Sequence, residues 1–211
     1  MSPPGGVSAT PEAASASFAT GRGRHDVPAA VVVATAAAAA SLAAAPGLGG
    51  ITGAGLALTA CAIAVIDARR FIIPDELNLA GLVLALANAA TSQDGWITGI
   101  AVALLRGAVL ASIFFAIGFV YRLARGRDGV GLGDVKLAAV AGAWLDWTML
   151  PVAVEAAALS ALAMHLIGAA RAGRPVRRMS RLPFGLFFAP AIWLAWLAQT
   201  LQLLPFLGAT P

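Results

Sequence analysis

The chain has 211 residues, of which 60% are hydrophobic and only 11% are charged. Soluble domains have about a quarter of their residues charged, so the composition excludes an ordinary soluble domain. A single cysteine, Cys61, excludes a disulfide framework and a cysteine-based zinc site. The formal charge of +4 does not indicate nucleic acid binding, because the basic residues follow the loops as membrane topology requires.

Apolar stretches long enough for membrane-spanning helices recur along most of the chain. Residues 1–26 are rich in Ser, Pro, Ala and Gly and predict a disordered tail. Seven spans are expected, at about 28–45, 49–66, 77–92, 97–120, 135–147, 149–170 and 184–204. The predicted fold class is therefore an all-α polytopic membrane protein, with an N-terminal span at 27–47 and a six-helix domain at 48–205. A cleaved signal peptide is the alternative interpretation of the first span.

The basic residues predict the orientation of the spans. All Lys and Arg residues except Arg106 fall in segments that share one side of the membrane if the spans alternate. The positive-inside rule then predicts a cytoplasmic N-terminus and a C-terminus outside. The cluster from Arg171 to Arg181 belongs to such a cytoplasmic segment, where anionic lipid explains it more simply than nucleic acid does.

The first acidic motif begins at Asp67, in the stretch IDARRFIIPDELN. Pro74 lacks an amide hydrogen and disfavours helix in the residue before it, so the chain should leave the helix and turn here. Asp75 or Asn78 would then cap the third span. An interfacial charge paired with a neighbouring arginine is the alternative role for Asp67.

The second acidic motif is glycine-rich and ends at Asp134. Gly129, Gly131 and Gly133 alternate up to this residue, and glycine lets a backbone or a substrate approach closely. A flexible loop with Asp134 as an ordinary N-cap is the alternative. Lys136 either acts on the acidic site, anchors the loop, or extends to the membrane interface.

The order of the spans places Asp67 and Asp134 at the same, cytoplasmic, membrane boundary. Carboxylates near the hydrocarbon are costly and usually functional. Two that approach closely cannot both ionise easily, so they share a proton. One can then act as general base on water while the other polarises a peptide carbonyl. This is the chemistry of an aspartic protease, which needs no metal and no cofactor.

Both motifs resemble those of the prepilin peptidases, or type IV leader peptidases, in the Gly-x-Gly-Asp class of intramembrane aspartic proteases. The first signature, an aspartate followed by polar or basic residues and then Ile-Pro-Asn/Asp, fits Asp67 and Pro74. The second, Gly-x-Gly-Asp-x-Lys-Leu, is matched in full by residues 131–137. A Pro-Phe-Gly segment is present at 183–185, but Leu186 replaces the proline that usually follows. The resemblance covers about residues 50–205 and implies that Asp67 and Asp134 are the catalytic dyad.

The resemblance also implies the partner, a prepilin or pseudopilin precursor whose basic leader stays in the cytoplasm. Three acids, Asp75, Glu76 and Asp128, are candidates to attract that leader. Many bacterial members carry paired Cys-x-x-Cys motifs and methylate the new N-terminus. With one cysteine and short cytoplasmic loops, this chain is expected to be a peptidase only.

Two other functions are alternatives. A small transporter or channel could use Asp67, Asp134 and Arg106, but no internal repeat is visible and the midplane is nearly bare of acids. A presenilin-like protease would require Tyr-Asp and Pro-Ala-Leu motifs, which the chain does not have.

Arg106 and Glu155 are the most deeply placed charges in the predicted spans. A buried ion pair that also involves Asp146 is expected, because an unpaired charge at this depth is expensive. A proton or ion path is the alternative.

Overall fold

The computed structural model describes residues 11–126, 129–171 and 183–203, with side chains from residue 28 onward. Within these ranges the chain forms seven α-helices and no strand, which confirms the predicted all-α fold class. The helices are α1 (Pro11–Ala44), α2 (Leu48–Arg70), α3 (Asp75–Ala89), α4 (Trp96–Arg125), α5 (Leu132–Trp144), α6 (Met149–Arg171) and α7 (Phe184–Thr200).

Three of these helices, α2, α4 and α6, are long and apolar enough to cross a membrane. The apolar part of α1, Pro28–Ala44, and α7 are shorter apolar helices. Helices α3 and α5 have 15 and 13 residues, so at about 1.5 Å per residue they are shorter than a bilayer core of about 30 Å. These helix lengths are those of a multi-pass membrane protein in which shorter helices pack among several long spans.

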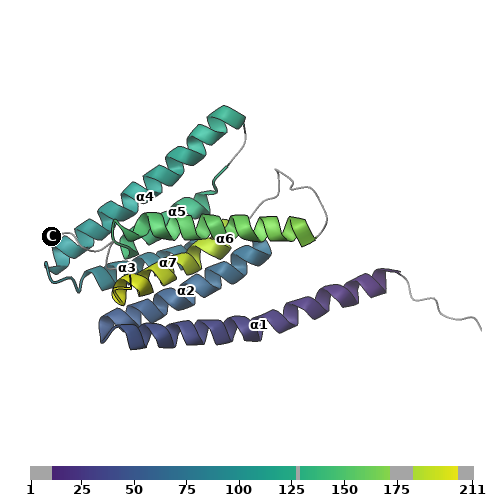
Figure 1. The fold of residues 1–211 in the computed structure, drawn as a ribbon, viewed down its shortest axis with the longest axis horizontal. Coiled ribbons are helices and arrows are strands. Elements are labelled where there is room, and N and C mark those ends of the chain that lie inside the picture. The colour runs from purple at the N-terminus through teal and green to yellow at the C-terminus, as the bar shows by residue number, and fades with distance from the viewer. Residues whose placement is uncertain (1–10, 127–128, 172–182, 204–211) are drawn as a thin grey trace, which may run out of the picture.

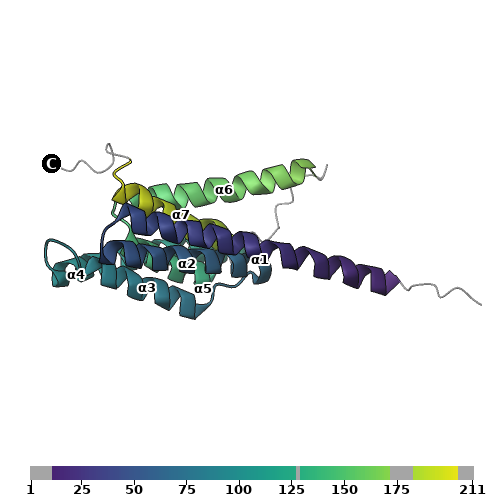
Figure 2. The ribbon, with the colours of Figure 1, turned by 90° about the horizontal axis from the view of Figure 1, so that it is seen from below.

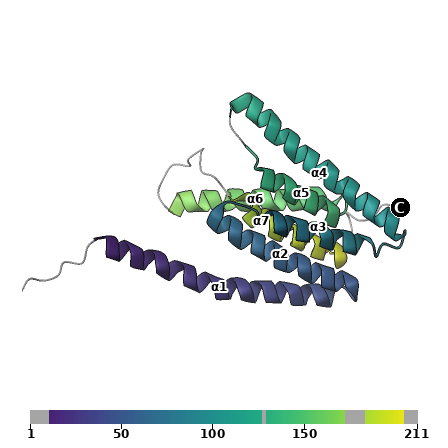
Figure 3. The same cartoon turned by 180° about the vertical axis from the view of Figure 1, so that it is seen from behind.

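Successive helices run in opposite directions along the bundle (Figure 1). Helix α1 packs on α2 at one edge, and α4 packs on α5 at the opposite edge (Figure 3). Helix α6 covers α7, which in turn packs on α2 (Figure 2). Because the directions alternate, the end of α2, the start of α5 and the start of α7 all lie at one end of the bundle.

The N-terminal helix differs from its prediction. Helix α1 begins at Pro11, so the backbone of residues 11–26 is helical where a disordered tail is expected, and residues 1–10 lie outside the described part. Alanine and glutamate have high intrinsic helix propensity, which needs no apolar periodicity. The first turns of α1 project beyond the other helices (Figures 1 and 2).

Small residues let the central helices pack closely. A Cβ added at Gly142 of α5 would clash with the backbone of Arg106 and Gly107 in α4, and one added at Gly107 would lie 2.8 Å from the carbonyl oxygen of Ala139. Interfaces of this kind are typical of membrane helices, where backbones approach through small residues. The α4–α5 contact therefore fixes the position of α5.

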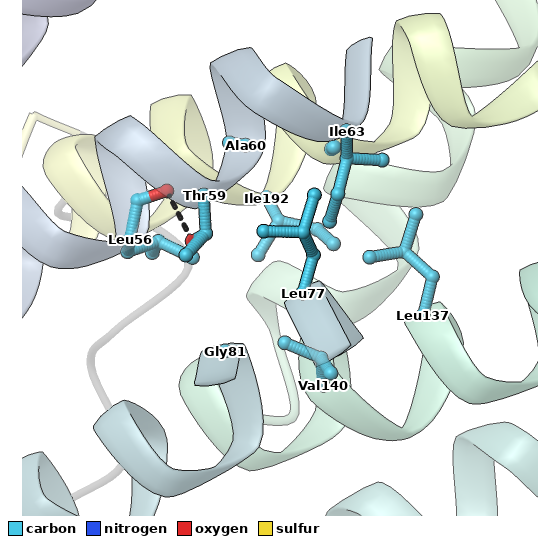
Figure 4. Close-up of a pocket in the computed structure, with 10 residues that line it drawn as sticks. Leu56, Thr59, Ala60, Ile63, Leu77, Gly81, Leu137, Val140 and Ile192 are labelled. Carbon is cyan, nitrogen blue, oxygen red and sulfur yellow. Dashed lines mark hydrogen bonds between the residues drawn. The ribbon is translucent and has the colours of Figure 1, made fainter. Parts of the chain in front are cut away.

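The centre of the bundle is apolar and nearly filled. Side chains from α2, α3, α5 and α7 converge around a cavity of about 10 Å³, lined by residues that include Leu56, Leu77, Leu137 and Ile192 (Figure 4). A space of this size holds at most about one water molecule, so it is a packing defect and not a ligand site. The acidic side chains of the two motifs lie instead at the ends of these helices.

Candidate active site

Asp67 lies in the last turn of α2 and is only 5% exposed. Its Oδ2 accepts a hydrogen bond of 3.0 Å from the backbone N–H of Leu186, and the backbone N–H of Gly185 also donates to this carboxylate. Both amides belong to the first turn of α7, where N–H groups have no acceptor within the helix. The carboxylate therefore sits at the positive end of the α7 dipole, a ready-made site for an anion.

The turn after Asp67 follows the sequence prediction. Helix α2 ends at Arg70, and Phe71 adopts a left-handed conformation with φ of 54° while its N–H bonds to the carbonyl of Asp67. Pro74 is extended and forms the N-cap of α3. The chain thus leaves the helix between Phe71 and Pro74, as the proline requires.

The expected cap of α3 by Asp75 or Asn78 is wrong. The N-cap is Pro74, without a side-chain hydrogen bond, while Asp75 and Glu76 lie in the first turn, where the helix dipole favours acids. The carboxylate of Asp75 is engaged elsewhere, with Lys136. Asn78 lies a full turn into the helix and is buried.

Asp134 is the third residue of α5, and the N-cap of that helix is Gly131. The Asp134 carboxylate reaches back and accepts a hydrogen bond of 3.3 Å from the N–H of Gly131. Asp134 is therefore not the N-cap itself. Its side chain is half-buried, and it satisfies one of the free amides at the start of the helix.

Asp67, near the end of α2, and Asp134, near the start of α5, lie at the same end of the bundle (Figure 1). Ile73, from the first motif, lies between α5, which holds Asp134, and α7, whose first turn binds Asp67. A Cβ added at Gly133 would lie 3.3 Å from the Cβ of Ile73, and one added at Gly185 would lie 2.8 Å from its Cδ1. The glycines of α5 and α7 thus pack against the same isoleucine, which draws both carboxylates into one cluster.

Lys136 forms an ion pair with Asp75. Its Nζ lies 2.7 Å from each carboxylate oxygen of Asp75, and both side chains are more than half exposed. An exposed pair contributes about 0–1 kcal/mol, but it links α5 to α3. Of the roles considered for Lys136, the structure favours anchoring.

The three acids that could attract a basic leader differ in the structure. Asp75 is compensated by Lys136. Glu76 is exposed and makes no ion pair within the described ranges, and Asp128 lies outside them. Only Glu76 therefore remains as an uncompensated acid on the described surface of α3.

The charges at the opposite end of the bundle form a separate unit. Arg106 of α4 pairs with Asp146 at 2.6 Å, as the sequence predicts for these two. Glu155 does not join them: it is exposed and forms no ion pair with any residue that the structure describes. The reason is that α6 packs mainly on α7 and not on α4.

Comparison with known proteins identifies the family. The sequence model of the type IV leader peptidase family matches residues 54–166, a stretch that contains Asp67, Asp134 and the turn between α2 and α3. The chain belongs to the type IV leader peptidase family.

Curated relatives agree with this family assignment. A "Prepilin leader peptidase/N-methyltransferase" of Burkholderia pseudomallei is 36% identical over 136 residues, which cover 64% of this chain and 42% of the relative. Proteins with the same name from Aeromonas hydrophila and Pseudomonas aeruginosa are 32% and 34% identical, over 72% and 69% of this chain and 51% and 49% of theirs. The chain thus spans about half the length of these relatives. No solved structure matches it at a significant level.

One contributor to the site has no motif residue of its own in the sequence, the pair of backbone amides at Gly185 and Leu186. The available signal was the Pro-Phe-Gly segment, since a proline just before a helix marks free amides in the next turn. Leu186 stands where the family pattern has proline. A proline at this position would have no N–H to donate, so the hydrogen bond to Asp67 depends on residue 186 not being proline.

Proposed function

We propose that the chain is an intramembrane aspartic endopeptidase that removes the basic leader from type IV prepilin or pseudopilin-like precursors. One arrangement carries the proposal: Asp67 and Asp134, from separate helices, lie at one end of a membrane-protein bundle around the same side chain, Ile73. Membership of the type IV leader peptidase family supports it. So do the curated relatives, whose names state prepilin leader peptidase activity.

In the proposed reaction the two carboxylates share one proton. The ionised carboxylate takes a proton from a water molecule, whose oxygen attacks the peptide carbonyl, while the protonated carboxylate donates to the carbonyl oxygen. The tetrahedral intermediate then collapses: the C–N bond breaks, the first carboxylate returns its proton to the leaving nitrogen, and a hydroxyl of the intermediate returns a proton to the second carboxylate, which restores the shared-proton pair. No other reactant is consumed.

The proposed orientation puts this site at the cytoplasmic face. Basic residues end the helices at the dyad's end of the bundle: Arg69 and Arg70 in α2, Arg125 in α4 and Arg171 in α6. Positively charged segments stay in the cytoplasm, and so would the basic leader of a precursor. The N-terminus and the active site would then be cytoplasmic, and the end of α7 outside.

We further propose that this chain cleaves without methylating. The relatives' names include N-methyltransferase, but the chain has one cysteine, and the connections after α2 and α4 span only residues 71–74 and 126–131. Purified protein supplied with labelled S-adenosylmethionine and a cleaved pilin should transfer no methyl group. Labelled pilin would refute this restriction and leave the peptidase proposal intact.

The decisive experiment replaces each aspartate with its amide. Asp67→Asn and Asp134→Asn proteins, reconstituted in liposomes with a prepilin, should leave the precursor uncleaved. Glu155→Gln is the matched control, since it also removes one carboxylate but from an exposed position on α6. Full cleavage by either asparagine variant would refute the proposal, and ion flux without proteolysis would support a transporter.

A further inference from the structure

A groove of about 420 Å³ lies between α3 and α5, outside the apolar core. The charged residues Asp75, Glu76 and Lys136 line the part nearest the two helix N-termini. Leu79 and Leu82 line the part further along α3. Its volume lies within the range of ordinary ligand sites, about 300–1,000 Å³. The groove therefore combines a charged end with an apolar body.

Asn78 in the wall of this groove has a buried amide without a partner. The residue is only 5% exposed, and neither its Nδ2 nor its Oδ1 has a hydrogen-bond partner among the described residues. Leaving such a group unpaired is costly, so buried amides normally have partners. Both amide atoms have almost no exposed surface, so an occupant of the groove reaches them only after the side chain rotates toward it. The amide then offers donors and an acceptor, and a peptide group satisfies both at once.

The charges at the groove favour a cation. Asp75 and Lys136 neutralise one another at 2.7 Å, and Glu76 adds a negative charge with no ion pair among the described residues. The residues that line the groove thus carry a net negative formal charge, which favours a basic side chain over an anionic lipid headgroup within the groove itself. An occupant that is cationic at one end and offers backbone amides is a basic peptide.

The groove lies on the other side of α5 from Asp134, about one helix width away. Lys136 and Asp134 are two residues apart on α5, so they point about 200° apart around a helix about 10 Å across. An extended chain covers that width with about three residues. Gly131, which precedes the helix and is exposed, has no side chain to obstruct a peptide that passes over this end of α5.

We propose that the α3–α5 groove binds the leader of the substrate, a few residues from the scissile bond, with Glu76 pairing with a basic side chain and Asn78 with the peptide backbone. The inference rests on the proposed function, because it assumes that the cleaved substrate carries a basic leader. It assigns Glu76 and Asn78 to substrate binding and leaves the chemistry to the dyad.

The first test is a charge-dependent change in KM. Cleavage of a prepilin with a lysine-containing leader is measured in phosphatidylcholine liposomes with wild type, Glu76→Gln and the control Glu155→Gln. We expect Glu76→Gln to raise KM by about three- to tenfold with kcat within about twofold, and the control to change neither. A substrate whose leader lysines are replaced by glutamine should have the same raised KM with wild type and Glu76→Gln, because the two changes remove one interaction.

Asn78→Leu supplies a second, independent readout. It should raise KM for both substrates, because it removes a backbone contact and not a charge. It should leave thermal stability unchanged or higher, because it also removes an unpaired buried amide. If this variant does not fold, Glu76→Gln still decides the inference.

The outcomes separate the two proposals. If wild type cleaves the prepilin but both variants keep its KM, the groove inference is refuted and the peptidase proposal stands. An effect of Glu76→Gln that is equal for both leaders would also refute the inference and indicate lipid in the groove. If wild type cleaves no precursor with a basic leader, the proposed function itself fails.

Discussion

The backbone N–H of Leu186 donates a hydrogen bond of 3.0 Å to Oδ2 of Asp67, joining the first turn of α7 to the last turn of α2. This bond connects the segment that begins at Asp67 with the Pro-Phe-Gly segment at 183–185 and the residue after it, which lie far apart in the sequence. It holds the carboxylate by backbone atoms, which have less freedom than a side chain. The geometry of Asp67 therefore depends on where α7 begins.

Replacing Leu186 with proline tests this dependence. Proline fits the first turn of a helix but has no N–H, so Asp67 keeps only the donor at Gly185. We expect kcat for precursor cleavage to fall by about tenfold, the order of one hydrogen bond to a charged group, with KM unchanged. Leu186→Ala keeps the N–H and should retain kcat. Equal loss in both variants would show that the leucine side chain matters and not the amide.

Gly185 is predicted to tolerate no side chain. A Cβ there would lie 2.8 Å from Cδ1 of Ile73 and 3.0 Å from Oδ2 of Asp67, so Gly185→Ala should displace the carboxylate and lower kcat. Shortening the neighbour in the double variant with Ile73→Ala should restore part of the activity, since it relieves one of the two clashes. Gly168→Ala on α6 is the control, because nothing lies within 4 Å of its added Cβ. Full activity in Gly185→Ala would contradict the close packing.

The Lys136–Asp75 pair is predicted to anchor and not to catalyse. Lys136→Met should lower the free energy of unfolding by under about 1 kcal/mol, because both side chains are exposed. The measurement is unfolding in detergent with increasing denaturant, together with precursor cleavage. The exchanged double variant, Asp75→Lys with Lys136→Asp, should recover the lost stability. A loss of cleavage as complete as in Asp134→Asn would instead place Lys136 in the chemistry.

The Arg106–Asp146 pair predicts an asymmetry between two single variants. The side chain of Arg106 is 13% exposed and that of Asp146 is 60% exposed, so Asp146→Asn leaves a buried cation unpaired while Arg106→Met leaves an exposed anion. We expect Asp146→Asn to be the more destabilising change, by about 1–3 kcal/mol. Cleavage by the folded protein should be normal in both, because the pair lies at the end of the bundle away from the dyad. Equal destabilisation would mean that the arginine is more hydrated than its burial indicates.

The position of Asp67 and Asp134 at the same end of the bundle could be predicted from the sequence because it depends on span order alone. Alternating helices bring the end of the second and the start of the fifth to one side, whatever their rotation. The end of the helix before Pro74 could also be predicted, because it depends only on the local chemistry of proline.

Contacts that depend on how each helix is rotated could not be predicted in this way. The partner of Lys136 is Asp75 because α5 presents that face to α3, and Glu155 lacks a partner because α6 packs on α7. The role of the Leu186 amide was hidden for another reason. Almost any residue type has a backbone N–H, so the identity of a residue does not reveal that its N–H is a donor. Here the donor is at Leu186, where the sequence differs from the family motif.

The position of Ile73 between Gly133 and Gly185 has a consequence for biosynthesis. The ribosome makes α7 after α2, α3 and α5, so the carboxylate of Asp67 has no amides to bind until all of these have been inserted and packed. Under the proposed function, a partly translated chain would cleave much more slowly than the complete bundle. Such coupling between completion of the bundle and activity would protect neighbouring nascent membrane proteins from a half-made enzyme.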